Sequence, residues 1–341
     1  MSKQLSIAII GAGYWGKNLI RVFNAVPDAR IAAVCDANEK RLVPVRAQHP
    51  HILVTKSADD LFSDRSIQAV LIATPPATHF DLARRALDAG KHVWIEKPMT
   101  ETVADAEELA RLARVKKHIL LVDHTFLYTA AVRKMKELIE RGELGAIRYL
   151  DSERINLGLI QPDVNVIYDL AAHDISIFNH LLGYAPVAVH AIGASHVTKK
   201  SVNPREELAY VGLRYPNDIM AQIRVSWLSP VKIRKMLIGG SKKMIIYDDI
   251  EPTEKIRVYD HGVEIDFEKD TATDPTYRSG DVLIPHIENN EALLDEAKHF
   301  VSCIREKKQP LTDAANGIAV MKALEAANVS LKRNGEMVAI A

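Results

Sequence analysis

The side chains of this 341-residue chain that most suggest chemistry are an aspartate and a histidine four positions apart. Asp169 and His173 lie in the segment 168–174, and on a helix this spacing puts both side chains on one face. Histidine has an unperturbed pKa suited to proton transfer near neutral pH. His173 could therefore remove a hydroxyl proton while Asp169 holds the substrate or orients a neighbouring group. The residues alone also allow a helix-capping aspartate and a structural histidine.

A lysine supplies the complementary charge. Lys97 stands between Glu96 and Pro98, directly after the apolar run His92–Ile95. Pro98 restricts the local backbone, so the ammonium can be held in one direction. An ammonium beside an alcohol oxygen would stabilise the alkoxide that develops as the proton leaves. A solvated surface lysine is the alternative that a single residue leaves open.

A glycine-rich turn predicts a nucleotide site. The segment 11–16 reads Gly-Ala-Gly-Tyr-Trp-Gly and stands between a buried-type strand and a helical pattern. In the G-x-G-x-x-G pattern the first glycine permits a tight turn, the second lets the backbone approach a pyrophosphate, and the third allows close helix–strand packing. The helix N-terminus would hold the pyrophosphate. The residues predicted to line this dinucleotide site are Gly11, Gly13, Tyr14, Trp15 and Gly16.

An acidic residue at the end of the next strand favours NAD over NADP. Asp36 lies twenty positions after Gly16, where a carboxylate can accept hydrogen bonds from both adenosine ribose hydroxyls and would repel a 2′-phosphate. Two observations leave room for other interpretations. Asp36 could be the N-cap of the following helix, and the nearby Arg41 could pair with a 2′-phosphate.

Two further segments follow predicted strands. Thr74, Pro75, Pro76 and His79 come after the run 69–73, and Glu96 with Lys97 comes after the next run. In an open α/β sheet, ligands bind beyond the carboxyl ends of the strands. We therefore expect both segments beside the nicotinamide of the cofactor.

The elements that must position these residues alternate in the first third of the chain. Short Val- and Ile-rich runs are typical of strands buried on both faces, and amphipathic helical patterns separate them. The predicted strands are 5–10, 31–34, 69–73, 92–95 and 119–122, and the predicted helices are 19–26, 39–47, 79–87 and 104–115. Such alternation predicts a doubly wound parallel sheet, a Rossmann domain over residues 1–124.

The pattern changes after residue 125. Helices are predicted around 132–139, ending at Gly142, and from 168 to 182, ending at Gly183; two more are predicted at 291–307 and 313–332. Strands at 187–196, 208–215, 219–227, 233–238, 244–247 and 256–259 follow each other closely. Asn217 and Asp218 have turn chemistry between two of them. Residues 125–341 are therefore predicted to form an α+β domain with a large, mostly antiparallel sheet that binds substrate.

Composition excludes several classes of function. The chain has 44 basic and 44 acidic side chains, so its net charge is zero. It therefore lacks the excess positive charge that favours binding to nucleic acid or to an anionic membrane surface. No run of apolar residues is long enough for a signal-peptide core or a membrane span. Two distant cysteines, Cys35 and Cys303, fit a reduced cytoplasmic setting. His49 and His51 form the only close histidine pair, without a third ligand at zinc-like spacing, so no metal site is expected.

Taken together, these motifs resemble the Gfo/Idh/MocA family, the relatives of glucose–fructose oxidoreductase and inositol 2-dehydrogenase. The resemblance covers nearly the whole chain and is carried by residues 11–16, 73–79, 90–98 and 169–173. It implies that Lys97, Asp169 and His173 form the catalytic group and contact substrate. It also implies a second domain whose open sheet face builds homodimers or homotetramers.

Four segments are similar to family members of nucleotide-sugar pathways, some of which oxidise C3 of UDP-N-acetylglucosamine or its uronic acid. They are residues 154–158, 227–232, 239–244 and 247–249. This narrower resemblance makes Arg154 and Asn156 candidates for a substrate-binding loop. The chain lacks the Gly-Gly pair that precedes the aspartate in sugar and inositol dehydrogenases, which bears on substrate more than on mechanism. Two other hypotheses remain, an inositol or free-aldose dehydrogenase with the same residues and a non-catalytic dinucleotide-binding regulator.

Overall fold

The computed structural model describes residues 4–161, 163–202, 204–264 and 275–340. The chain folds into two compact units. Unit 1 is Met1–Tyr128 with Asn290–Met321, and unit 2 is Thr129–Asn289 with Lys322–Ala341. None of the helices in the described ranges combines the length and apolarity needed to cross a bilayer.

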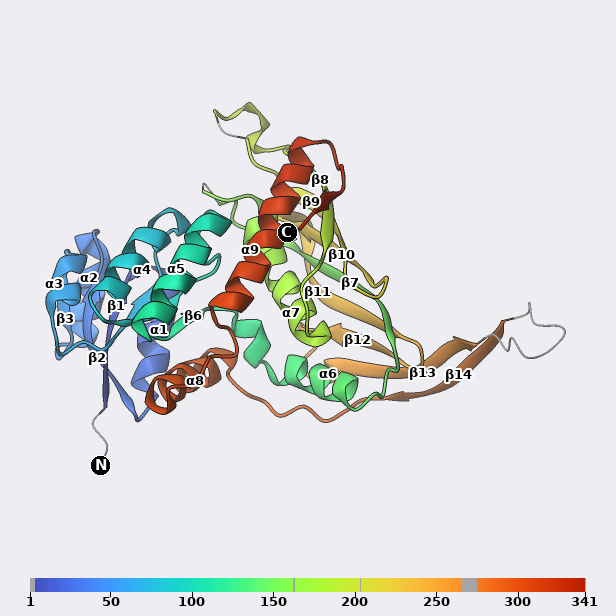
Figure 1. Cartoon of the computed structure of the whole chain (residues 1–341), viewed down its shortest axis with the longest axis horizontal. Helices are drawn as coiled ribbons and strands as arrows, with labels where there is room; N and C mark the ends of the chain where they lie inside the picture. Colours follow the sequence, from blue (N-terminus) through green and yellow to red (C-terminus); the bar gives the residue numbers. More distant parts are fainter. Residues whose placement is uncertain (1–3, 162, 203, 265–274, 341) are drawn as a thin grey trace. The chain divides into compact units, whose positions relative to one another are not determined.

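Unit 1 is built on a six-stranded parallel sheet (Figure 1). Its strands are β1 (Leu5–Ile10), β2 (Ala29–Cys35), β3 (Leu53–Thr55), β4 (Ala69–Ile72), β5 (His92–Ile95) and β6 (Leu120–Val122). Their order is β3-β2-β1-β4-β5-β6, and each neighbouring pair is parallel. The strand order reverses between β1 and β4, so the predicted doubly wound fold is confirmed. Strand β3, three residues long, was not predicted.

Helices connect these strands. They are α1 (Tyr14–Asn24), α2 (Glu39–Gln48), α3 (Ala58–Ser63), α4 (His79–Asp88), α5 (Val103–Lys116) and the 3₁₀ turns η1 (Pro76–Thr78) and η2 (Thr125–Tyr128). Helix α8 (Ala292–Glu306) also belongs to unit 1, although its position in the sequence falls in the second predicted domain. The reason is its apolar face: the Phe300 ring lies edge-on to that of Trp94, with 5.6 Å between centroids, and Phe23 contacts Trp94 in the same way.

Unit 2 contains a nine-stranded sheet in the order β14-β13-β12-β11-β7-β10-β9-β8-β15. The strands are β7 (Ile147–Leu157), β8 (Ala188–Ala194), β9 (Leu208–Arg214), β10 (Met220–Ser226), β11 (Leu228–Gly240), β12 (Met244–Asp248), β13 (Ile256–Glu264), β14 (Thr276–Leu283) and β15 (Val338–Ala339). The pair β7–β10 is parallel and the other pairs are antiparallel. The predicted mostly antiparallel sheet is therefore confirmed, but its central strand β7 was not predicted.

Helices α6 (Ala130–Glu140) and α7 (Ala172–Leu182) pack against each other on one face of this sheet (Figure 1). A π-helical turn, Ile167–Ala171, precedes α7, and the 3₁₀ turn η4 (Thr198–Lys200) follows β8. Helix α9 (Ala314–Lys332) has residues in both units. Gly142 and Gly183 have φ of +70° and +84°, as predicted for residues that end helices, and Asn217 and Asp218 form the predicted turn with φ of 62° and 57°.

Candidate active site

The glycine turn of unit 1 is closed by two residues that tolerate no side chain. Gly11 has φ +100°, and a Cβ there would lie 2.4 Å from the carbonyl oxygen of Ala73. A Cβ at Gly16 would lie 1.8 Å from the carbonyl oxygen of Gly11. The first and third glycines of the motif therefore pack the turn against β4 and against itself, as the sequence pattern predicts.

The second glycine leaves room instead. A Cβ on Gly13 would meet only the Arg41 guanidinium, at 3.9 Å. Gly13 is the N-cap of α1, no side chain caps this helix, and its first turn holds no acidic residue. Backbone N–H groups at such an end need acceptors from outside the helix, and the helix dipole favours an anion there. This open cradle fits the pyrophosphate of a dinucleotide.

Asp36 lies at the end of β2 with a side chain only 7% exposed. Its Oδ2 accepts the backbone N–H of Ala12 at 2.8 Å, and its Oδ1 accepts that of Asn38 at 2.8 Å. Both oxygens are fixed while each keeps a lone pair for a ribose hydroxyl. The interpretation of Asp36 as the N-cap of α2 is wrong, because Asn38 occupies that position and accepts the Lys40 N–H. Arg41, half-exposed, lies 3.5 Å from Asp36.

The loops after β4 and β5 are joined by a histidine. His79 is fully buried, and its two ring nitrogens face the carbonyl oxygens of Pro98, at 2.9 Å, and Thr74, at 2.8 Å. The Lys97–Pro98 peptide bond is cis. Pro75 is exposed and Thr74 is half-buried. His79 thus holds together the two segments that the sequence predicts beside the nicotinamide, and its own ring lies in the interior.

The end of the next strand, β6, carries a histidine that was not predicted as a site residue. His124 follows β6, is 1% exposed, and neither ring nitrogen has a hydrogen-bond partner among the described residues. Burial, together with the positive charge of the nearby Lys97, lowers the pKa of His124 to about 3. A neutral imidazole therefore lies close to Lys97. The available signal was positional, since His124 follows β6 as Glu96 and Lys97 follow β5.

In unit 2, Asp169 lies in the π-helical turn rather than in a regular α-helix. The wider turn alters the face on which Asp169 projects relative to His173, and such turns are frequent at functional sites. The indole Nε1 of Trp227 donates a 3.0 Å hydrogen bond to Asp169 Oδ2. The carboxylate is therefore held by a specific donor.

Trp227 is itself held rigidly. It is 1% exposed, its backbone N–H donates to the Glu207 carbonyl, and its own carbonyl accepts the N–H of Gly158, each bond being 2.9 Å long. A Cβ on Gly158 would lie 2.7 Å from the Trp227 ring. The sequence pointed to Trp227 and Gly158 only as parts of segments similar to nucleotide-sugar enzymes. In the structure the two segments are joined by the hydrogen bond between Gly158 and Trp227, and Trp227 in turn contacts Asp169.

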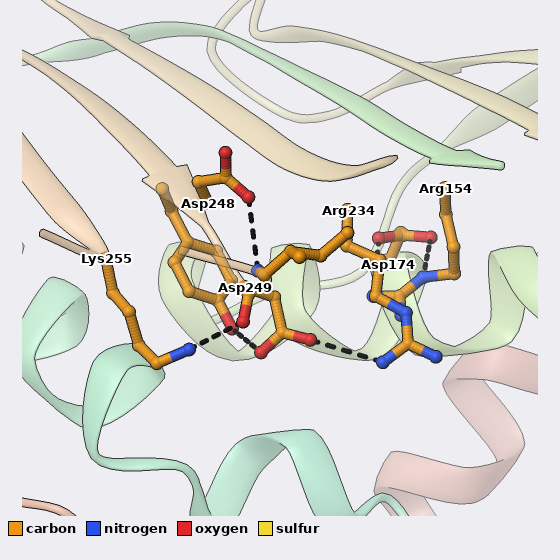
Figure 2. Close-up of polar contacts among 8 residues, drawn as sticks. Arg154, Asp174, Arg234, Asp248, Asp249 and Lys255 are labelled. Atoms are coloured by element: carbon orange, nitrogen blue, oxygen red, sulfur yellow. Dashed lines mark hydrogen bonds and ion pairs between the residues drawn. The ribbon is translucent and has the colours of Figure 1, made fainter. Parts of the chain in front are cut away.

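His173 is the second residue of α7 and directly precedes a member of a buried ion pair. The next residue, Asp174, is fully buried and accepts bonds from Arg154 Nε at 2.9 Å and Arg154 Nη2 at 3.1 Å (Figure 2). It also accepts a bond from Ser152 Oγ at 2.8 Å. Burial alone would disfavour the charged guanidinium, but the charge and hydrogen bonds of Asp174 outweigh it and the pKa of Arg154 is raised. Arg154, predicted as a substrate ligand, is 4% exposed and holds β7 to the helix that carries His173.

A second layer of polar contacts lies beside this pair. Arg234 Nη1 donates to the Asp249 carboxylate at 3.2 Å, and Lys255 donates to the Asp249 carbonyl at 2.5 Å (Figure 2). The Tyr247 hydroxyl donates to the same carboxylate at 2.9 Å. Burial and the charge of Asp249 raise the pKa of Tyr247 well above its ordinary value. Asn156, the other predicted substrate ligand, is half-buried near the end of β7.

The predicted catalytic residues are divided between the units, with Lys97 in unit 1 and Asp169 and His173 in unit 2. Within the part of the chain that the structure describes, no three His, Cys, Asp or Glu side chains are arranged to hold a metal ion. Cys35 and Cys303 are both buried and free. What the two units offer is a dinucleotide cradle with a lysine in one, and an oriented aspartate with a histidine in the other.

Comparison with known proteins gives consistent matches to both parts of the chain. Residues 5–124 match the model of the GFO_IDH_MocA oxidoreductase family with an NAD-binding Rossmann fold, and residues 132–246 match the GFO/IDH/MocA C-terminal domain. A UDP-N-acetylglucosamine 3-dehydrogenase of Acidithiobacillus ferrooxidans is 28% identical over 327 residues, 94% of this chain and 95% of that protein. The solved structure of UDP-N-acetylglucosamine 3-dehydrogenase from Acidithiobacillus ferrooxidans is similar with a TM-score of 0.79 and 25% identity, covering 97% of this chain and 99% of that chain. The uncharacterised oxidoreductase YrbE of Bacillus subtilis is 29% identical over 262 residues, 74% of this chain and 76% of that protein.

Proposed function

Because the chain belongs to the GFO/IDH/MocA oxidoreductase family, with an NAD-binding Rossmann domain, we propose that it oxidises C3 of a UDP-N-acetylhexosamine-type nucleotide sugar. One structural observation carries the reaction class: the uncapped helix end at Gly13, with the buried Asp36 at the end of the neighbouring strand. The substrate class is supported by the similarity to a UDP-N-acetylglucosamine 3-dehydrogenase along nearly the whole of both chains.

When bound, NAD supplies the nicotinamide carbon that accepts a hydride. The chain holds it through the N–H groups at the start of α1 and through the carboxylate of Asp36, which accepts hydrogen bonds from the ribose hydroxyls. The fixed geometry of Asp36 favours this role, because Ala12 and Asn38 hold both of its oxygens. Arg41 is half-exposed and its guanidinium lies 3.5 Å from Asp36.

In the proposed reaction an imidazole nitrogen of His173 takes the proton of the sugar hydroxyl. The Lys97 ammonium donates a hydrogen bond to the same oxygen and stabilises the negative charge that develops there. Asp169, held by the Trp227 indole, accepts a hydrogen bond from the substrate or from the proton-accepting group. Each of these residues contacts the substrate or the group that takes its proton, so small displacements of any one should reduce turnover.

Arg154 enters this proposal as a positioning residue instead of a substrate ligand. Its guanidinium and the Ser152 hydroxyl fix Asp174, and Asp174 directly follows His173. The ion pair therefore holds the first turn of α7 against β7. Asn156, half-buried near the end of the same strand, remains proposed as a substrate contact.

The absorbance of reduced nicotinamide tests the proposal directly. Purified protein would be mixed with NAD or NADP and a panel of UDP-sugars, free sugars and inositols. Growth of the band with NAD and a UDP-N-acetylhexosamine is expected. Growth only with free sugars or inositols would replace the nucleotide-sugar proposal with the cyclitol or aldose one. A flat trace across the panel, with NADH binding intact, would contradict catalysis on these substrates and favour the regulator.

A matched pair of histidines on α7 tests the assignment of His173. His173→Asn is expected to bind NADH normally and to lose about 10²- to 10⁴-fold in kcat, the usual contribution of a positioned acid–base group. His180→Asn, seven positions later on the same helix, is expected to retain turnover. Equal rates for His173→Asn and the unsubstituted protein would contradict the assignment.

A further inference from the structure

Three buried carboxyl groups lie together in unit 1. Glu96, Asp123 and Glu296, here called the acid cluster, are 6%, 3% and 0% exposed. The Asp123 carboxyl lies within hydrogen-bonding contact of both glutamates. Buried carboxylates are costly unless paired with cations or neutralised, so a cluster in this position calls for a physical explanation.

The parallel sheet brings the first two acids together. Ile95 of β5 pairs with Val122 of β6, and the backbone N–H of Asp123 donates to the Ile95 carbonyl at 2.8 Å. Glu96 and Asp123 therefore continue the same register one position beyond the paired strands. Aligned residues of parallel strands point to the same face of the sheet, so the two carboxyl groups share one face at the carboxyl edge.

Helix α8 supplies the third acid. Side chains alternate along a strand, so Glu96 and Asp123 point to the same face as Trp94 and Leu121, which pack in the core that includes Phe300. Glu296 lies among the apolar positions of α8 and is as deeply buried as Phe300. The helical spacing that buries the apolar face of α8 therefore places a glutamate in the core as well.

The donors around these groups are too few for three carboxylates. The Thr125 hydroxyl donates to Asp123, and the backbone N–H of Lys97 donates to the Glu96 carboxyl. Among the described residues, no N–H group donates to Glu96 Oε1, Asp123 Oδ2 or either oxygen of Glu296. The Thr125 hydroxyl also lies against Glu296, but its one proton is already donated to Asp123. Contacts between carboxyl groups without such donors require that some of the groups carry a proton. Burial first, and the charge of Asp123 second, raise the pKa of Glu96 and of Glu296 well above the ordinary value.

We propose that the acid cluster positions Lys97: protonated carboxyl groups of Glu96 and Glu296 donate to Asp123, and Glu96 in turn accepts the backbone N–H of Lys97. Asp123 is then the common acceptor of two acid protons and of the Thr125 hydroxyl. The cluster joins the strand end that carries Lys97 to helix α8, which returns to this unit from much later in the chain. The role for Lys97 rests on the proposed function, whereas the protonation of the cluster does not.

If the protonated carboxyl group of Glu296 acts only as a hydrogen-bond donor to Asp123, a glutamine amide should be able to replace it. In Glu296→Gln the amide NH₂ can donate to Asp123 as the acid proton does, whereas Glu296→Ala removes the donor and leaves Asp123 under-satisfied. We expect Glu296→Ala to lower kcat at least tenfold with little change in NADH affinity, and Glu296→Gln to restore most of it. Glu291→Gln, an exposed residue just before the same helix, is the matched control and should retain wild-type kcat.

Two spectroscopic measurements report on the acid cluster and do not depend on catalytic turnover. Infrared spectra at pH 7 should contain the C=O band of protonated carboxyl groups, and this band should weaken in Glu296→Gln and persist in Glu291→Gln. In protein labelled with ¹⁵N-lysine, the backbone amide signal of Lys97, assigned by its loss in Lys97→Met, should shift in Glu296→Ala and return toward its original position in Glu296→Gln.

The outcomes separate the two proposals. Absence of a protonated-carboxyl band that depends on Glu296, or an equal loss of kcat in the glutamine and alanine variants, would overturn the acid cluster. An unmoved Lys97 amide in Glu296→Ala would overturn its positioning role even if the band were present. An inactive wild-type protein with the band and the amide shift both as expected would overturn the proposed function alone.

Discussion

The two units bury charged residue types in opposite ways. In unit 2 the carboxylate of Asp174 meets the Arg154 guanidinium through two hydrogen bonds and a third donor, Ser152. In unit 1 the buried acids Glu96 and Glu296 contact another acid, without enough donors to satisfy three carboxylates. One network keeps its charges and pairs them. The other, in our proposal, removes charge by holding protons.

The difference should determine how each network responds to mutation and to pH. Removing one partner of a paired network leaves the other charge buried and uncompensated, which is costly. A protonated network tolerates an amide in place of an acid, but it loses stability when the pH drives ionisation. Both networks lie next to a proposed catalytic residue, Asp174 beside His173 and Glu96 beside Lys97. A catalytic side chain can therefore be held in position either by a neighbouring ion pair or by neighbouring groups that are protonated and neutral.

The largest expected effect is on the paired network. Arg154→Leu should lower the free energy of unfolding by about 3–5 kcal/mol, because Asp174 would remain buried without its cation. Urea unfolding of the transition that includes unit 2 measures this loss. The matched control is Arg224→Leu, whose 2.6 Å pair with Glu153 joins side chains that are 44% and 31% exposed; it should cost about 0–1 kcal/mol. Similar losses in the two variants would contradict a special role for burial.

The acid cluster predicts an unusual dependence of stability on pH. Because the folded pKa of Glu296 lies above its ordinary value of 4.5, its stabilising contribution is complete below that value and is lost as pH rises toward the folded pKa. As pH rises above that ordinary value the free energy of unfolding should therefore fall, by up to about 1.4 kcal/mol per pH unit for each such group, until the folded pKa is passed. The same reasoning applies to Glu96, whose pKa is raised by burial and by Asp123 although the charge and backbone N–H of Lys97 oppose the shift.

The substitution Glu296→Gln measures how much Glu296 contributes to the change of the free energy of unfolding with pH. The groups that face Glu296 are Glu96, Asp123 and Thr125, with Tyr128 of η2 close by. Since glutamine does not titrate, the variant should lose stability less steeply than the wild type as pH rises over the same range. Identical slopes in urea unfolding at several pH values would argue that Glu296 is not held protonated.

The smallest expected effect concerns the support of Asp169. Trp227→Phe removes the indole N–H that donates to Asp169 while keeping an aromatic ring against Gly158. Loss of one hydrogen bond to a charged group should lower kcat/KM about tenfold, or about 1.4 kcal/mol. NADH affinity, measured by fluorescence titration, should not change. A variant with unaltered kcat/KM would show that this hydrogen bond does not orient Asp169 for the reaction.

The comparison also explains what the sequence could not predict. Strand β7 was missed because its buried positions include Ser152 and Arg154 in place of an alternation of apolar side chains. Those polar residues are buried only because Asp174, twenty positions later than Arg154, supplies the partner. Strands are predicted from the regular spacing of apolar residues. A strand whose buried face is held by an ion pair lacks that spacing and is therefore missed.

Local rules succeeded where the determinants are local. The glycine turn, the ends of helices at Gly142 and Gly183, and the turn at Asn217 depend on backbone angles that few residues adopt. The π-helical turn at Asp169 and the burial of Glu296 depend on tertiary packing instead. A glutamate among the apolar positions of α8 was a readable signal, but its protonation follows only from its neighbours in the folded chain.

Deuterium transfer tests the central claim most directly. UDP-N-acetylglucosamine carrying deuterium at C3 would be incubated with the protein and NAD, and the reduced nicotinamide examined by NMR. Deuterium is expected at the nicotinamide carbon that accepts the hydride, and it should appear far more slowly when Lys97→Met or His173→Asn replaces the wild type, by about 10²-fold or more for His173→Asn. NADH formed without deuterium, or no NADH formed while NAD binds, would contradict the proposed oxidation at C3.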